Sequence, residues 1–186
     1  VGTFDAGISV LDKTSGQFTR YKNDSLVSQS LSNNFVQGIY GDSRGNVFIS
    51  TMQTLDVFDS ETNTFRPFDS INLLQVDRTN LFEDSDGNYW IGSSSGLFKY
   101  NEKRKLQTTY TVEDGLPSDN ITGILEDDNQ NLWISTHNGL VLFKDAVHAD
   151  SLKQFRVFSV QEGLQGAEFK IGSCYRDAQG NMYFGG

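Results

Sequence analysis

The sequence is poor in several features that mark particular classes of protein. Its 186 residues include two prolines and a single cysteine, Cys174. One cysteine excludes an internal disulfide framework and, alone, a zinc site, but it does not fix the redox compartment. No apolar run approaches the roughly 18 residues that a membrane helix needs, and residues 1–11 lack the zones of a signal peptide. We therefore expect this piece of chain to be soluble.

Basic residues are also scarce. Lysine and arginine number 15 against 24 acidic residues, so the formal net charge is -9. A field of this sign repels polyphosphate and anionic lipid, and we expect neither nucleic acid nor a membrane surface as a partner of this domain. Hydrophobic residues at 37% and aromatic residues at 12% exclude disorder as the main state. The 18 glycines and the absence of long helical periodicity favour an all-β fold.

One short pattern occurs four times. Its aspartates are 42, 43 and 50 residues apart. The four copies are Asp42-Ser-Arg-Gly-Asn-Val-Phe-Ile-Ser, Asp84-Ser-Asp-Gly-Asn-Tyr-Trp-Ile-Gly, Asp127-Asp-Asn-Gln-Asn-Leu-Trp-Ile-Ser and Asp177-Ala-Gln-Gly-Asn-Met-Tyr-Phe-Gly. A repeat of roughly 40 to 50 residues with several short strands is the length of a β-propeller blade.

Turn signals within one period predict four strands, which we call a, b, c and d. In the period after the first loop they cover residues 36–40, 47–51, 55–58 and 65–68. The connections are short enough for hairpins, so each period predicts a four-stranded antiparallel meander. Consecutive apolar residues in strand b, such as those around Trp90 and Trp133, require cover on both faces. We interpret both tryptophans as blade-to-blade packing residues.

The predicted fold is an all-β β-propeller fragment of four-stranded antiparallel blades with about four repeats. It comprises three complete blades, at about 34–70, 76–110 and 119–160, plus two half blades, 1–22 and 169–186. Unpaired strand edges are sticky, so both half blades need partners. They could pair with each other in a four-bladed ring, with a second chain, or with blades beyond this sequence. We favour a fragment of a propeller of about seven blades.

Two long segments carry a resemblance to a known family. The sequence Tyr110-Thr-Val-Glu-Asp-Gly-Leu-Pro-Ser-Asp-Asn-Ile-Thr-Gly-Ile-Leu-Glu-Asp, followed by Asn131-Leu-Trp-Ile-Ser-Thr-His-Asn-Gly-Leu, resembles the two-component regulator propeller repeat. The segments that begin at Leu31 and Gly163 are similar to it too. The sequence departs from the repeat at Gln130 in place of the turn glycine, at Leu55 in place of Gly-Leu, and at Asp77-Arg78 in place of an apolar strand start.

The resemblance implies a function as well as a fold. Such repeats build the periplasmic sensor region of hybrid two-component histidine kinases in Bacteroides-type bacteria. The implied ligand is an oligosaccharide or disaccharide released from a glycan, and the implied signal passes to a histidine kinase in a homodimeric parent. The kinase and the membrane contact would belong to other parts of that parent. We expect no cofactor.

The turns of a meander divide the ligand candidates between two unlike faces. The d-to-a and b-to-c connections emerge on one face, which we call the variable face, because its residues differ from blade to blade. Amides and charges there suit a carbohydrate, and an arginine suits an acidic one. Arg78 is the sharpest candidate because it aligns with apolar Val36, Ile121 and Ile171, although a local ion pair to Asp77 or Glu83 would also explain it. The predicted ligand-binding residues are Gln53, Asp77, Arg78, Asn120, His137 and Lys170.

Metal binding and catalysis are weaker interpretations. The Asp84 and Asp127 turns mimic the start of a calcium loop, but Ser95 and Asn138 stand where the bidentate acid belongs, which favours turn capping. The possible imidazole bases are His137 and His148, and no serine has a nucleophile-elbow setting. Glu126 and Asp127 point to opposite faces of a strand and do not converge. Cys174 aligns with core residues. We predict a non-catalytic sensor; the alternatives are a carbohydrate-active propeller enzyme (lyase or glycosidase) and a structural protein-interaction propeller.

Overall fold

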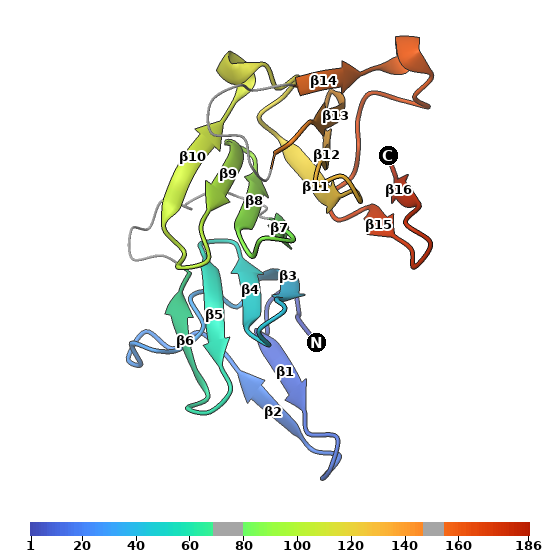
Figure 1. The fold of residues 1–186 in the computed structure, drawn as a ribbon. Helices are drawn as coiled ribbons and strands as arrows, with labels where there is room; N and C mark the ends of the chain where they lie inside the picture. The colour runs from blue at the N-terminus through green and yellow to red at the C-terminus, as the bar shows by residue number, and fades with distance from the viewer. Residues whose placement is uncertain (69–79, 147–154) are drawn as a thin grey trace. The chain divides into compact units, whose positions relative to one another are not determined.

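The computed structural model describes residues 1–68, 80–146 and 155–186 (Figure 1). Predicted residues Asp77, Arg78 and His148 lie outside these ranges. The chain divides into two compact units, Val1–Thr79 and Asn80–Gly186. Within the described ranges, no helix is long and apolar enough to cross a membrane.

The first unit contains a hairpin and one four-stranded sheet. The hairpin joins β1 (Ile8–Leu11) to β2 (Phe18–Tyr21), and Gly2 forms an antiparallel bridge to Ile8 on its other side. The sheet runs in chain order through β3 (Val36–Gly41), β4 (Val47–Thr51), β5 (Leu55–Asp59) and β6 (Thr64–Pro67), all antiparallel. A core of Ile8, Leu31, Ile49 and Phe65 joins the hairpin to the sheet.

The second unit contains two four-stranded antiparallel sheets and a final hairpin. One sheet is β7 (Asn80–Glu83), β8 (Tyr89–Ser93), β9 (Gly96–Tyr100) and β10 (Leu106–Tyr110). The next is β11 (Ile121–Glu126), β12 (Leu132–Thr136), β13 (Gly139–Phe143) and β14 (Phe155–Phe158). The hairpin is β15 (Cys174–Arg176) and β16 (Met182–Phe184). We call each four-stranded sheet a blade and each hairpin a half blade.

These sheets confirm the predicted architecture of three complete blades plus two half blades. Two d-to-a loops of the second unit each begin with a short 3-10 helix, at Val112–Asp114 and Val160–Glu162. A capping box starts each helix, and a glycine in the left-handed region ends it. The Thr/Ser-x-x-Asp/Glu-Gly pattern therefore specifies the start of this loop.

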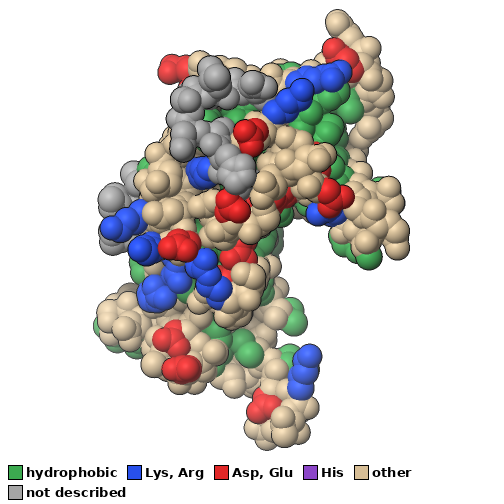
Figure 2. Space-filling view, in the orientation of Figure 1, with side chains coloured by type: hydrophobic (Ala, Val, Ile, Leu, Met, Phe, Trp, Pro, Cys, Tyr) green, Lys and Arg blue, Asp and Glu red, His purple; other side chains and the backbone are tan. Residues whose placement is uncertain are grey.

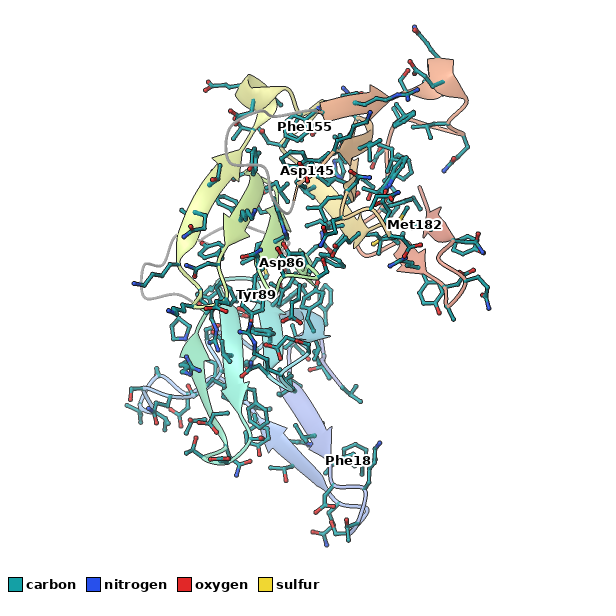
Figure 3. The ribbon with its side chains drawn as sticks, viewed as in Figure 1. Phe18, Asp86, Tyr89, Asp145, Phe155 and Met182 are labelled. Carbon is teal, nitrogen blue, oxygen red and sulfur yellow. The ribbon has the colours of Figure 1, made fainter. Side chains whose placement is uncertain are left out.

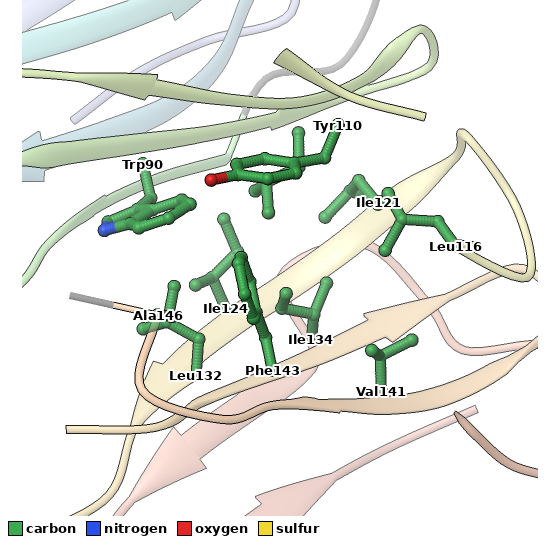
Figure 4. Close-up of a cluster of buried hydrophobic side chains, with 11 residues drawn as sticks. Trp90, Tyr110, Leu116, Ile121, Ile124, Leu132, Ile134, Val141, Phe143 and Ala146 are labelled. Carbon is green, nitrogen blue, oxygen red and sulfur yellow. The ribbon is translucent and has the colours of Figure 1, made fainter. Parts of the chain in front are cut away.

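The core of the second unit lies between two blades (Figure 4). Trp90 of β8 is fully buried, and its ring centroid lies 6.0 Å from those of Tyr110 in its own blade and Phe143 in the next. Tyr110 and Phe143 are 5.1 Å apart, edge to face. The prediction that Trp90 packs between blades is confirmed. Trp133 is half-buried and stacks on Phe158 of its own blade, with centroids 5.6 Å apart.

Candidate functional site

The a-to-b turns, opposite the variable face, are held by their own repeated side chains. In each of the four copies, the aspartate accepts a backbone hydrogen bond from the asparagine four residues later, at 2.7 to 3.0 Å, and a further one from that asparagine's side chain. The aromatic residue of strand b adds another bond where it has a donor. Trp90 Nε1, Trp133 Nε1 and the Tyr183 hydroxyl each donate to their aspartate, at 2.8, 3.1 and 3.0 Å. We call this unit the Asp corner.

The Asp corners confirm that these aspartates cap turns. Asp86, labelled in Figure 3, donates its backbone N–H to Asp84 Oδ1 at 3.1 Å, as a residue of a capped turn does. No group of three or more potential metal-ligating His, Cys, Asp or Glu side chains occurs within residues 1–68, 80–146 and 155–186. The Asp84 and Asp127 carboxylates cap their own turns.

Gln130 fits the Asp corner despite replacing its glycine. Its φ is 60°, in the left-handed region, where Gly45, Gly87 and Gly180 have φ of 83°, 80° and 87°. The side chain returns to the scaffold, because Gln130 Nε2 donates to Ser85 Oγ of the preceding blade at 3.1 Å. The substitution changes the residue but not the shape of the turn.

Neighbouring blades of the second unit are also connected at this end. Glu126 accepts hydrogen bonds from the Ser85 N–H at 2.8 Å and the Ser85 hydroxyl at 2.6 Å. Arg176 of the half blade pairs with Asp128 of the preceding blade. Glu126 thus reaches across to the preceding blade, whereas Asp127 caps its own turn, so the two acids do not form a glycosidase pair.

On the variable face, two predicted residues are brought together. The His137 N–H, in the turn after β12, donates to the Asn120 carbonyl, just before β11, at 3.1 Å. The Asn120 Oδ1 atom is buried and has no hydrogen-bond partner in the described part of the chain. In the first unit the equivalent bond runs from the Met52 N–H to the Phe35 carbonyl. The polar pair Asn120 and His137 therefore occupies the positions that the apolar pair Phe35 and Met52 occupies in the first unit.

Lys170 forms an exposed ion pair beside this turn. Its Nζ lies 2.6 Å from Glu168 Oε1. This hydrogen bond, with the positive charge of Lys170 and a weaker influence of His137, lowers the pKa of Glu168. The neighbouring Phe169 N–H donates to the Thr136 carbonyl, which ties this segment to the β12–β13 turn. Asn120 and His137 thus share one turn, and Lys170 and Glu168 lie on the segment tied to it; we call these four residues the polar cluster.

Glu168 was missed by the sequence reasoning for an identifiable reason. The Ala167 carbonyl accepts from the Gly139 N–H as the Asp119 carbonyl accepts from the Gly96 N–H, so Glu168 corresponds to Asn120. This register also corrects the alignment of Ile171 with Val36 and Ile121. Phe169 takes that position, because two extra residues precede β15 in its repeat. Counting loop residues forward from Leu164 would have found Glu168.

The other predicted ligand-binding residues do not join the polar cluster in the described part of the chain. Gln53 is exposed in the β4–β5 turn, where its N–H donates to Thr51 Oγ1 at 3.2 Å. Asp77 and Arg78 stay predictions, since neither is among the described residues. Asn34 and Asp119 close their loops by accepting the Asn23 and Val112 N–H groups, both at 2.8 Å, and so serve the scaffold.

Cys174 behaves as a packing residue. Burial raises the pKa of its thiol. A Cβ on Gly123 of the neighbouring blade would lie 2.7 Å from the Cys174 sulfur, so only glycine fits opposite it. The protonated, partly buried thiol matches the predicted core role rather than a nucleophile.

Surface charge is mixed on the face that Figure 2 shows, where acidic and basic side chains are interspersed over the blades. The whole chain still carries the net charge of -9. The face in view therefore carries no extended field of one sign.

Comparison with known proteins supports the architecture. The family model described as two component regulator propeller matches residues 30–53, 72–95 and 115–138. No relative matches significantly among proteins of curated function.

Solved structures share the fold at low sequence identity. The extracellular domain of BT4673 from B. thetaiotaomicron, described as a putative hybrid two component system, has a TM-score of 0.76 and 16% identity; the match covers 99% of this chain and 24% of that one. The BT3049 extracellular domain from B. thetaiotaomicron, described in the same way, has a TM-score of 0.54 and 17% identity, covering 99% of this chain and 30% of that one. Virginiamycin B lyase from Staphylococcus aureus has a TM-score of 0.66 and 14% identity, covering 95% of this chain and 55% of that one.

The chain thus spans about a quarter of the BT4673 domain, 24%. Sensor domains and lyases both occur among the similar folds. The repeated sequence, the three blades and the family match together identify this chain as a β-propeller fragment in which three segments match the two component regulator propeller repeat.

Proposed function

We propose that this chain is part of a periplasmic sensor region of a two-component system, and that a glycan fragment binds the polar cluster without being cleaved. Support for the cellular context comes from the propeller repeats and from the similarity to extracellular domains. The parent would act as a homodimer that passes its signal to a histidine kinase.

The single observation that carries the ligand proposal is the unpartnered Asn120 Oδ1. A buried acceptor without a partner costs about 1 to 3 kcal/mol, so a ligand hydroxyl that reaches this atom and donates to it would recover that energy. His137, Glu168 and Lys170 lie on segments joined to the same turn and offer both donors and acceptors.

Signalling requires more than binding. A ligand shifts the balance between two arrangements of a sensor dimer only if it binds one of them more tightly. Asp77, Arg78 and Gln53 are proposed further contacts, and Arg78 would favour an acidic sugar.

Calorimetric titration of the chain with uronic-acid disaccharides and with neutral glucose disaccharides tests this proposal. We expect Asn120→Ala to weaken binding at least tenfold, because it removes the unpaired acceptor. Asn129→Ala is the matched control, since Asn129 is exposed in the Asp corner on the other face, and it should bind unchanged. Binding that is equal in both variants, or absent for every disaccharide, would contradict the proposal.

A lyase is the second candidate, because lyase propellers share the fold and His137 lies close enough to Glu168 to help lower the pKa of that carboxyl. An unsaturated product released from an oligosaccharide by the chain, and lost in His137→Ala, would favour that enzyme over the sensor. A structural protein-interaction propeller would bind neither class of disaccharide.

A further inference from the structure

A second polar site lies in the first unit, far along the sequence from the polar cluster. A pocket of about 240 Å³ is bounded by the loop that follows β2 and by residues of β5 and β6. Its lining includes Asn23, Asp24, Ser28, Asp56 and Arg66. The loop spans residues 22–35, whereas the corresponding loop before β11 spans only residues 111–120. The longer loop has a serine-rich segment in place of the 3-10 helix.

Three residues in or beside this pocket depart from the repeat. Asp56 pairs with Ile49 across the sheet, at the position where Phe98 pairs with Ile91 and Val141 pairs with Ile134. Thr54 precedes β5 where glycines, Gly96 and Gly139, begin β9 and β13. Ser32 follows buried Leu31 as Pro117 follows buried Leu116.

These three departures form one hydrogen-bonded group. The Ser32 N–H donates to Asp56 Oδ2 at 2.8 Å, a bond that a proline at this position could not make. The Thr54 hydroxyl lies 2.7 Å from Asp56 Oδ1 and 2.6 Å from Ser32 Oγ. The Ser32 hydroxyl also lies 3.0 Å from Thr51 Oγ1. We call Ser32, Thr54 and Asp56 the polar triad.

The scaffold does not require this triad. Asp56 is only 2% exposed, and burial raises the pKa of its carboxyl despite the bonds from Ser32 and Thr54. In the second unit, Pro117 and Val141 stand at the equivalent positions without a buried charge. A buried carboxylate is costly where an apolar side chain would serve, so the triad calls for another purpose.

We propose that this pocket binds one neutral sugar ring. The Asp56 carboxylate, at the floor of the pocket, would accept a hydrogen bond from a hydroxyl of that ring. The bonds from Ser32 and Thr54 leave further lone pairs on the carboxylate oxygens. Serine hydroxyls and Arg66 supply the complementary groups, while Asp24 and Asp56 together oppose an anionic ligand. The volume lies just below the roughly 300 to 1,000 Å³ of pockets for drug-sized ligands, which suits a single ring. The proposal rests on the glycan-sensing function for its ligand class and adds a separate subsite.

Nuclear magnetic resonance titration of the full chain with methyl glucoside, methyl galactoside and methyl mannoside tests the subsite. We expect saturable shifts of the Ser32 and Asn23 amides with at least one glycoside. The pair S32P/D56V installs the proline and valine of the sibling blade and should remain folded, because it removes the buried charge together with its donor. This pair, and the isosteric D56N, should weaken binding at least tenfold.

The controls separate this proposal from the polar cluster. D59N alters a half-buried aspartate of the same blade that caps the β5–β6 turn and does not line the pocket, and it should bind the glycoside like the parent chain. Asn120→Ala should leave these shifts intact. If Asn120→Ala abolishes the shifts and S32P/D56V retains them, the subsite proposal alone is overturned. The subsite proposal is also overturned if no glycoside shifts the two amides, or if uronic acids shift them at lower concentration than neutral glycosides.

Discussion

The Asp84 corner allows a stringent test of how the blade is held, because Asp84 is only 4% exposed. Asp84 Oδ1 accepts the backbone N–H groups of Asp86 and Asn88, and Oδ2 accepts the Trp90 indole N–H at 2.8 Å. Asp84→Asn keeps the shape but replaces one acceptor by an NH₂ donor. In one orientation the new donor faces the indole N–H, and in the other it faces the two backbone donors.

The expected loss of stability follows from the hydrogen-bond donors that Asp84→Asn leaves without a partner. A buried donor that loses its acceptor costs about 1 to 3 kcal/mol, and a bond to a charged acceptor contributes about 1.5 to 3 kcal/mol. Since these values are not additive, we expect Asp84→Asn to reduce the free energy of unfolding of the second unit by about 2 to 4 kcal/mol.

Urea unfolding followed by circular dichroism measures this loss. Trp90→Phe removes the indole donor, so the double variant D84N/W90F should lose less than the sum of the single variants, with a coupling of about 1 to 2 kcal/mol. Asp177→Asn in the exposed corner of the half blade should cost less than Asp84→Asn. A loss below about 1 kcal/mol for Asp84→Asn, or strict additivity with Trp90→Phe, would refute the role assigned to the indole bond.

Two further predictions concern the next corner along the chain. Burial raises the pKa of Asp127, but the hydrogen bonds from Asn131 and Trp133 outweigh it and hold the pKa below its ordinary value of 3.8. The carboxylate therefore stabilises the fold above pH 3.8, and this contribution is lost as the pH falls through the lower pKa of the folded state. The urea midpoint should fall between about pH 5 and pH 2.5, and this fall should be smaller in Asp127→Asn. Gln130→Gly should change stability by less than about 1 kcal/mol, because relief of the left-handed strain is offset by greater unfolded-state entropy and the lost bond to Ser85, whereas Gln130→Val should destabilise by about 1 to 2 kcal/mol. Equal urea midpoints for the glycine and valine variants would contradict this.

The sequence by itself determined the repeat, the blades and the Asp corners. These features are local: strand alternation, turn residues and the spacing of an aspartate from its asparagine act within a few residues, and four copies reinforce one another. Even Gln130, which replaces the glycine of the Asp corner, adopts the same turn, since the neighbouring residues of the corner impose it.

Only the tertiary structure decided which variable residues meet. Glu168 joins His137 because two extra residues shift the register before β15. Asp56 meets Ser32 across a separation of 24 residues, through a loop whose length no repeat rule fixes. Loop conformation depends on contacts between distant segments, so the candidate sites emerge from packing, whereas hydrogen bonds within each turn are already encoded along the chain.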